Sequence, residues 1–134
     1  IDTQSLREAQ AGIYGPRSLA RLPTDVRAHY FDAVGAGEER RLITDLRESV
    51  TFSPVNLMDR ASVAEQGRFD LIFCRNVLIY FDDASRRTAA ENLFGALIPG
   101  GFLCLGHTES MSRIDDRYTV RRFPDAVVYQ RPAA

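Results

Sequence analysis

Three polar residues interrupt an apolar run in the middle of the chain. The run reads FDLIFCRNVLIYF, residues 69–81, and the three are Cys74, Arg75 and Asn76. Asparagine offers both a hydrogen-bond donor and an acceptor, which suits recognition of a polar ligand. Cys74 could act as a nucleophile only with a base beside it, and no histidine is placed to activate it. Packing is therefore the better interpretation of Cys74.

The elements on either side of this run explain why polar residues stand there. Residues 69–73 are continuously apolar and aromatic, which is typical of a short strand in a parallel sheet covered on both faces. Residues 82–101, DDASRRTAAENLFGALIPGG, predict a helix that Asp82 or Asp83 caps and that proline and two glycines end. The polar residues then follow the end of a strand and do not lie inside it.

The remainder of the second half predicts more sheet. FLCLGH, residues 102–107, is a second buried strand, and YTVRRF and AVVYQR on either side of PDA predict a closing antiparallel hairpin. A strand, a helix, a strand and a hairpin indicate an α/β domain with a mostly parallel sheet. Ligands of such sheets bind beyond the carboxyl ends of the strands. This rule marks residues 53–57, 74–80 and 106–110, and the N-terminal end.

The first half predicts shorter elements. Residues 2–12 predict a helix capped by Asp2 or Thr3 and ended by Gly12, and residues 16–31 predict helical turns broken at Pro23. Residues 30–34 and 41–46 predict a small hairpin around a polar turn. Residues 50–57, VTFSPVNL, alternate as a strand does until Pro54.

Composition excludes several classes of function. The 134 residues are enough for one compact domain, with 17 basic residues, all arginine, against 18 acidic ones. This balance argues against nucleic-acid binding. No apolar run approaches the roughly 20 residues that span a bilayer, so we expect no membrane insertion. Two cysteines in apolar settings are typical of a reducing cytoplasm, and with two distant histidines they form no metal pattern.

Four segments together resemble one protein family. FDLIFCRNVLIYFD, LIPGGFLCLGHTES, IDTQSLREAQAGIYG and VTFSPVNL are similar to the C-terminal part of the CheR-type chemotaxis receptor methyltransferases. The resemblance implies a Rossmann-like class I methyltransferase sheet with S-adenosylmethionine as cofactor. It implies methyl transfer to glutamate side chains on the cytoplasmic helices of chemoreceptors. Two alternatives stay open: a non-catalytic binding or signalling module, and a methyltransferase with a different acceptor.

The resemblance also assigns site residues. It implies that Asn56, Leu57, Arg75 and Asn76 contact the cofactor and that Tyr80 orients the reacting methyl group. Structural interpretations remain for three of them. Asn76 could cap the following turn, Arg75 could form an ion pair or contribute only its backbone, and Tyr80 could belong to the core.

Two further features matched by the resemblance concern a loop and a subdomain. In GHTES, His107 and Glu109 could touch the substrate or hold the loop against its neighbours, and we favour the second role. Residues 30–52 match a small inserted antiparallel β-subdomain. We expect it to contact the receptor helices and not a tethered receptor peptide.

The family pattern is incomplete in this sequence. No glycine-rich loop follows a first strand, and the first two strands of the methyltransferase sheet have no counterpart. Their absence leaves the strand at residue 69 with an apolar edge, which is an aggregation hazard. We therefore expect residues 1–134 to be the distal part of a larger catalytic domain that alone neither folds stably nor binds cofactor well.

Overall fold

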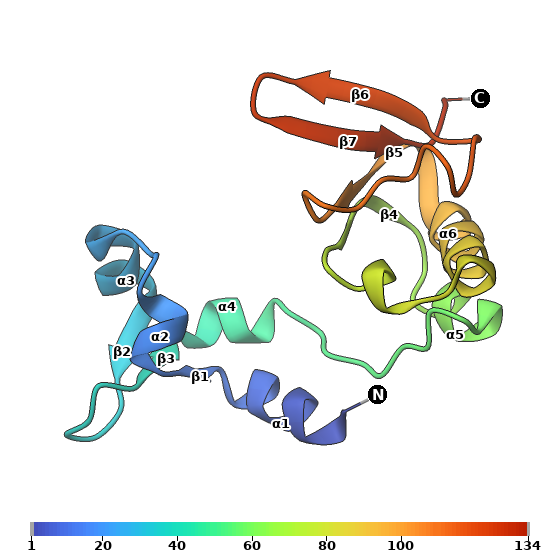
Figure 1. Ribbon diagram of the computed structural model, residues 1–134. Coiled ribbons are helices and arrows are strands. Elements are labelled where there is room, and N and C mark those ends of the chain that lie inside the picture. The colour runs from blue at the N-terminus through green and yellow to red at the C-terminus, as the bar shows by residue number, and fades with distance from the viewer. Residues whose placement is uncertain (1, 134) are drawn as a thin grey trace. The chain divides into compact units, whose positions relative to one another are not determined.

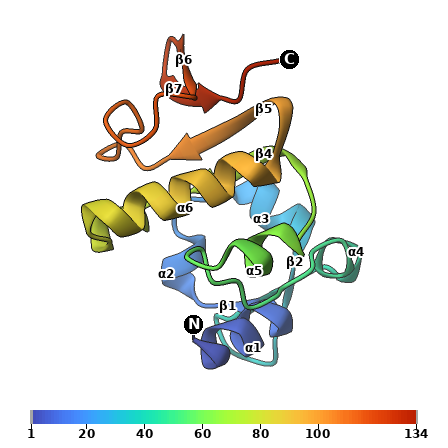
Figure 2. The ribbon, with the colours of Figure 1, turned by 90° about the vertical axis from the view of Figure 1, so that its right-hand side faces the viewer.

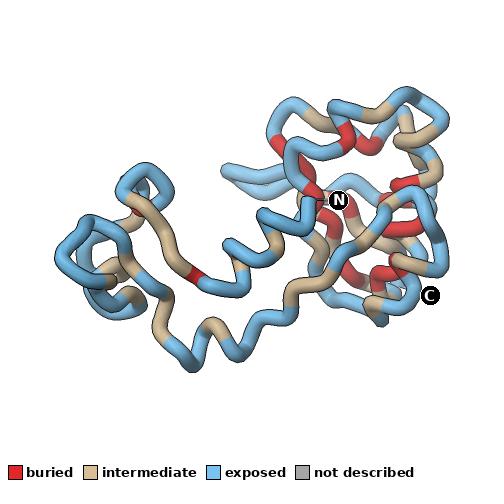
Figure 3. The backbone as a smooth tube through the Cα atoms, turned by 90° about the horizontal axis from the view of Figure 1, so that it is seen from below, coloured by how far each residue is buried: buried red, intermediate tan, exposed pale blue. Residues whose placement is uncertain are grey.

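The computed structural model describes residues 2–133 and divides the chain into two compact units (Figure 1). Unit 1 ends at Pro54 and unit 2 begins at Val55. Each unit contains a sheet of its own, with three strands in unit 1 and four in unit 2. Buried residues are concentrated in unit 2 (Figure 3).

The helices of unit 1 follow local signals in the sequence. Helix α1, Thr3–Ala11, begins where the Asp2 carboxylate accepts the Gln4 N–H at 2.9 Å, and it ends at Gly12, whose φ of 64° is left-handed. Both ends were predicted. Two short helices follow, α2 (Pro16–Leu19) and α3 (Thr24–Tyr30), on either side of the predicted break at Pro23.

The sheet of unit 1 confirms the predicted hairpin and extends it. Strands β2 (Phe31–Ala33) and β3 (Arg40–Leu42) pair antiparallel. The second strand is shorter than predicted because Thr44–Glu48 forms helix α4. A two-residue strand, β1 (Ile13–Tyr14), pairs with the other edge of β3. This sheet therefore begins before the predicted subdomain boundary at residue 30.

The predicted strand at residues 50–54 is wrong. The structure assigns no strand there, and no strand of residues 2–133 pairs with this segment. A strand needs a neighbour to accept and donate its backbone hydrogen bonds, and alternating side chains cannot replace that neighbour.

Unit 2 is a mixed sheet with one long helix. Its elements are α5 (Arg60–Ala64), β4 (Phe69–Cys74), the 3₁₀ turn η1 (Leu78–Tyr80), α6 (Asp83–Ala96), β5 (Leu97–Leu105), β6 (Thr119–Phe123) and β7 (Ala126–Gln130). The strand order is β4-β5-β7-β6. The predicted mixed α/β sheet and closing hairpin are confirmed. Parallel pairing among the described residues is limited to β4 with β5, so the sheet is not mostly parallel here.

One face of this sheet packs on α6 (Figure 2). The Asp82 carboxylate caps the helix by accepting the Ser85 N–H at 2.7 Å. The helix contributes Ala89, Ala90 and Leu93 to a core that also contains Leu97 and Leu103. The last two side chains are fully buried. Each such leucine contributes about 1.5–3 kcal/mol to stability.

Strand β4 lies at the edge of the sheet and is covered on one side only. Leu71 and Phe73 are 47% and 68% exposed, whereas the Cys74 side chain is buried against the core. The prediction that this strand is covered on both faces is therefore wrong for residues 2–133. The predicted apolar edge is present.

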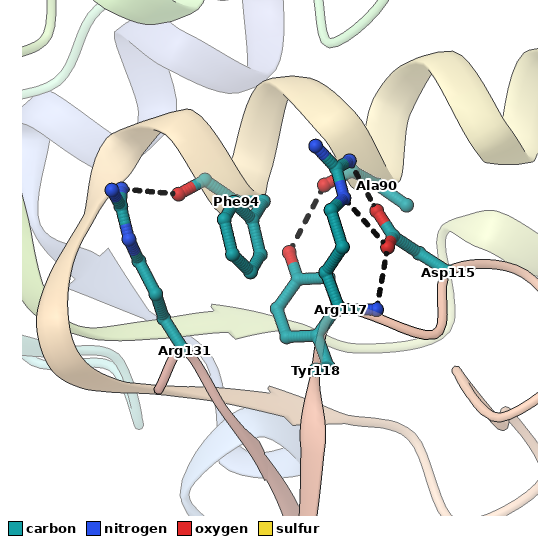
Figure 4. Close-up of polar contacts among 6 residues, drawn as sticks. All are labelled: Ala90, Phe94, Asp115, Arg117, Tyr118 and Arg131. Atoms are coloured by element: carbon teal, nitrogen blue, oxygen red, sulfur yellow. Dashed lines mark hydrogen bonds and ion pairs between the residues drawn. The ribbon is translucent and has the colours of Figure 1, made fainter. Parts of the chain in front are cut away.

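The β6–β7 hairpin is fixed to α6 by an aromatic and arginine cluster (Figure 4). The Tyr118 hydroxyl donates to the Ala90 carbonyl at 3.0 Å, and its ring meets Phe94 edge-on at 5.1 Å. The guanidinium groups of Arg117 and Arg131 lie 4.7 and 4.9 Å from the centre of the Phe94 ring. Arg131 also donates to the carbonyls of Phe94 and Leu97, so the residue that follows β7 satisfies the end of the helix.

Gly101 lies where β5 approaches β4 closely. A Cβ atom there would lie 3.0 Å from the Ile98 carbonyl oxygen and 3.1 Å from those of Phe69 and Asp70. These are backbone atoms, so we expect Gly101→Ala to lower the free energy of unfolding by about 1–3 kcal/mol.

Gly95 supplies the matched control, because it lies in α6 with no atom within 4 Å of its added Cβ. Gly95→Ala should raise the free energy of unfolding by about 0.5–1 kcal/mol. Urea unfolding followed by circular dichroism measures both variants. Equal stability of the two would contradict the close approach at Gly101.

Candidate functional site

The segment after β4, residues 74–80, forms a crest at the carboxyl end of the parallel pair. Cys74 ends the strand and is buried, whereas Arg75 and Asn76 are exposed. Asn76 has a φ of 60°, a left-handed conformation that asparagine tolerates better than most residues. The chain then turns into η1. The polar residues of the crest therefore lie outside the sheet, as the sequence predicted.

The Glu109 carboxylate holds the crest against the loop after β5. One oxygen, Oε2, accepts the N–H groups of Asn76 at 2.7 Å and Gly106 at 2.8 Å. The other, Oε1, accepts the Ile79 N–H at 3.3 Å. We call these four residues the Glu109 clamp. The predicted role of Glu109 in holding its loop is confirmed.

The clamp favours the charged form of Glu109. Partial burial of the carboxyl raises its pKa, but the hydrogen bonds from the N–H groups of Asn76, Gly106 and Ile79 outweigh burial. The pKa of Glu109 is therefore lowered below its usual value. An ionised carboxylate accepts the three donors at neutral pH.

Gly106 is required by the tight geometry of the clamp. A Cβ atom on this residue would lie 2.7 Å from Asn76 Oδ1 and 2.8 Å from Glu109 Oε2. Both distances are shorter than normal contacts, so any side chain at position 106 would displace one of these groups. Gly106 therefore lets the Asn76 side chain lie directly over the end of β5.

Cys74 is a packing residue, as predicted. Burial of the thiol, with a smaller contribution from the nearby Glu109 charge, raises its pKa to about 11. The thiol is thus protonated at neutral pH, and a thiolate nucleophile is excluded.

Arg75 and Tyr80 are both available to a ligand. Among residues 2–133 Arg75 forms no ion pair, so no partner in this part of the chain supports the structural ion-pair interpretation. Arg75 lines a hollow of about 580 Å³ together with Phe73 and His107. Tyr80 is 81% exposed, so the core interpretation of this residue is also wrong. His107 is exposed as well.

Two interpretations of Asn76 are separated by the structure. Val77, not Asn76, holds the cap position of η1, and among residues 2–133 Asn76 hydrogen-bonds only through its backbone N–H, so the capping role is wrong. The left-handed backbone gives a structural reason for asparagine that needs no ligand. The exposed side-chain amide remains free to take a second role with a ligand.

Asn56 and Leu57 lie on a different segment of unit 2. The Asn56 side-chain oxygen accepts the Met58 N–H at 3.0 Å, and its backbone N–H donates to Ser62 Oγ at 3.0 Å. The Leu57 carbonyl accepts Asn92 Nδ2 at 2.9 Å, and its side chain packs on the core. The structure thus attaches this segment to α6, and in the described chain no hydrogen bond joins it to Asn76.

Asn92 is a positioning residue that the sequence analysis missed. It lies in the buried stripe of α6 and is only 9% exposed. A polar residue within the stripe of Ala89, Leu93 and Ala96 was the available signal, because a buried amide needs a partner. Its partner is the Leu57 carbonyl.

Comparison with known proteins gives one decisive match. The family model for the CheR methyltransferase SAM-binding domain matches residues 1–127. This chain belongs to the CheR methyltransferase family. The CheR family domain binds S-adenosylmethionine, which is therefore the cofactor of this family. Among residues 2–133, no helix is long and apolar enough to cross a bilayer, and no cluster of side chains could hold a metal ion.

Individual CheR-family relatives agree over nearly the whole chain. The chemotaxis protein methyltransferase 2 of Vibrio cholerae is 48% identical over 132 residues, which are 98% of this chain and 46% of the relative. The chemotaxis protein methyltransferase 1 of Pseudomonas aeruginosa is 36% identical over 93% of the chain and 45% of its own length. The Escherichia coli relative is 36% identical over 90% and 43%. The chain thus spans less than half the length of these relatives.

The residues of the crest fit the polar parts of S-adenosylmethionine. The cofactor carries an adenine edge and an amino-acid end, each with donors and acceptors. Arg75 and Asn76 present exposed donor groups at the carboxyl end of β4, and Asn76 also presents an acceptor. Asn56 is exposed too, with its side-chain oxygen already used.

Proposed function

We propose that the protein transfers a methyl group from S-adenosylmethionine to glutamate side chains of chemoreceptors. The observation that supports this most is the crest, where the Glu109 clamp holds Arg75, Asn76 and Tyr80 exposed at the end of β4. The names of the relatives, all chemotaxis protein methyltransferases, favour this acceptor over others.

In this proposal each site residue has a distinct role. Asn76 and Arg75 bind the cofactor from the crest, and Asn56 and Leu57 bind it from the segment attached to α6. Tyr80 orients the methyl group toward the acceptor. The cofactor supplies a methyl group on a positively charged sulfur. A carboxylate oxygen forms the new bond to carbon as the carbon–sulfur bond breaks, and because the acceptor is already ionised, the protein needs no general base.

The partner in this proposal is the cytoplasmic region of a methyl-accepting chemoreceptor. The β-subdomain predicted at residues 30–52, which includes β2 and β3, is a candidate contact surface for the receptor helices. The reaction then takes place in the cytoplasm.

The exposed edge of β4 supports a further part of the proposal. Leu71 and Phe73 are apolar, exposed and unpaired on one side of the strand. We propose that further strands of the methyltransferase sheet pair with this edge, as the sequence predicted, and that they complete the cofactor site. Binding experiments on this site should therefore use the protein at its full genomic length.

Cofactor binding tests the proposal at Asn76. Because φ at this residue is 60°, alanine would add backbone strain, whereas glycine would remove the side chain without strain. We expect Asn76→Gly to weaken S-adenosylhomocysteine binding by about 5- to 150-fold, the effect of losing one or two hydrogen bonds. Calorimetric titration measures it, with Asn76→Ala as the strained comparison. Unchanged affinity in a folded Asn76→Gly protein would leave Asn76 only its backbone role.

The methylated product distinguishes three functions: a protein-glutamate methyltransferase, a methyltransferase with a different acceptor, and a non-catalytic binding module. Methyl esters of glutamate release methanol in base, so radioactive methyl transferred to a receptor fragment should be base-labile. Stable label would indicate a different acceptor group. Cofactor binding without any transfer would indicate a binding module.

A further inference from the structure

A cleft of about 620 Å³ lies beside the crest and shares residues with it. Its walls come from η1, the start of α6 and the loop after β5. Ile79 and Glu109, both in the Glu109 clamp, line it, and so do Arg86, Arg87 and Arg113. Tyr80 directly follows Ile79 along the chain, so the cleft is adjacent to the residue proposed to orient the methyl group.

The acidic groups of the cleft are bonded within the protein, whereas two of its arginines are not. The Glu109 carboxylate is occupied by three backbone N–H groups. Asp83 pairs with Arg86 at 3.1 Å, and Arg86 also donates its Nε–H to the Leu78 carbonyl at 2.9 Å. Both acidic groups of the cleft are therefore satisfied within the protein.

Arg87 and Arg113 remain available. Both are exposed, and neither forms an ion pair within the part of the chain that the structure describes. Exposed hydroxyl-bearing residues, Thr108 and Ser112, lie in the same walls. The cleft thus presents two free guanidinium groups and hydroxyl donors, a combination that binds carboxylates.

We propose that this cleft binds an acidic side chain of the acceptor protein, next to the glutamate that is methylated. This inference rests on the proposed function, which places an acidic helix at Tyr80. A volume of about 620 Å³ is suited to side chains and not to a whole helix. Neighbouring carboxylates on a helix face lie three or four residues apart, so one can occupy the cleft while another reaches the crest. Arg87 and Arg113 then select acceptors that carry acidic groups around the reactive glutamate.

Charge reversal tests this proposal in the protein at its full genomic length. Arg87→Glu with Arg113→Glu should raise the KM for the receptor fragment at least about tenfold, since each opposed charge now repels the partner. The kcat and the affinity for S-adenosylhomocysteine should change less than about threefold. Raised salt should lower kcat/KM of the wild-type protein more than that of the double variant. Arg122→Glu, an exposed reversal on β6, is the matched control.

Three outcomes would overturn the proposal. One is a KM in the double variant equal to that of Arg122→Glu. Another concerns inorganic phosphate as a probe of the cleft. If the double variant loses phosphate binding while its KM for the receptor fragment is unchanged, the cleft is a general anion site. If the wild-type protein transfers no methyl group, the proposed function fails. Calorimetric titration of the receptor fragment then decides the cleft separately, and equal affinity of wild-type and double variant would reject it.

Discussion

Replacing Glu109 with alanine is expected to release the crest and abolish measurable cofactor binding. The variant leaves the N–H groups of Asn76, Gly106 and Ile79 without their common acceptor. Hydrogen bonds to a charged group contribute about 1.5–3 kcal/mol each when buried, and Glu109 is only partly buried, so we expect a loss near 2 kcal/mol in the free energy of unfolding. Cofactor binding should fall further because Asn76 loses its position.

Glutamine at position 109 separates charge from shape. It keeps one oxygen for Asn76 and Gly106 but turns an amide donor toward the Ile79 N–H. We expect Glu109→Gln to lose about 1 kcal/mol. Glu91→Gln, an exposed substitution on α6 without a recorded hydrogen bond in the described residues, is the control.

The stability lost in Glu109→Gln should depend on pH, because the folded-state pKa of Glu109 is lowered. A carboxyl with a lowered folded-state pKa stabilises the fold fully above its unfolded value, near 4.5, and the contribution disappears as pH falls through the lower folded-state pKa. The difference in unfolding free energy between wild type and Glu109→Gln should therefore be largest at pH 7 and shrink toward pH 3. Urea unfolding at several pH values measures it. A difference independent of pH would show that the charge is unimportant.

Substitution of Tyr80 should have the largest effect on catalysis and almost none on stability. The side chain is 81% exposed, so Tyr80→Ala should change the free energy of unfolding by less than about 0.5 kcal/mol. If Tyr80 orients the methyl group, its removal should lower kcat about 100-fold, the effect of misplacing the reacting groups. The affinity for S-adenosylhomocysteine should stay within about threefold.

Tyr80→Phe identifies the part of the side chain that matters. A loss equal to that of Tyr80→Ala assigns the role to the hydroxyl, and near-normal kcat assigns it to the ring. Val77→Ala, at a half-exposed neighbour in the same crest, controls for local disturbance. Single-turnover methylation of a receptor fragment measures the chemical step. A Tyr80→Ala protein with wild-type kcat would remove Tyr80 from the reaction.

Features that depend on neighbouring residues could be predicted from the sequence. Asp2 and Gly12 begin and end α1 as expected, and Asp82 caps α6. Each of these signals acts within one turn of the chain, so a single sequence contains all of it. The closing hairpin around residues 124–125 belongs to the same class.

Features that depend on distant partners could not be predicted in the same way. The segment at residues 50–57 alternates like a strand but has no neighbour, and the two residues of β1 are too few to show a period. The exposure of β4 likewise depends on what lies beside the strand and not on its own residues. Tertiary context decides strands more than helices.

In the candidate site, too, local features could be predicted from the sequence and long-range contacts could not. The position of Arg75 and Asn76 beyond a strand followed from the pattern of apolar residues. The three donors that converge on Glu109 come from residues 30 and 33 positions away and from its own loop, and only the structure reveals them. The left-handed backbone of Asn76 leaves no local sequence pattern. Asn92 is marked as a polar residue in an apolar stripe, but the sequence does not reveal that its partner is the Leu57 carbonyl, 35 positions away.

The strand order has a consequence for synthesis on the ribosome. β7 is the last strand made, yet it lies between β5 and β6, and the Arg131 backbone exchanges hydrogen bonds of 2.9 Å with Gly100 and Gly101. Because a nascent chain emerges from its N-terminal end, β4 and β5 can pair while β7 is still inside the ribosome. The last carbonyls of α6 also wait for the Arg131 side chain. Until residue 131 has left the ribosome, the β5 edge of this pair therefore stays unpaired, and an unpaired strand edge is a surface that chaperones bind.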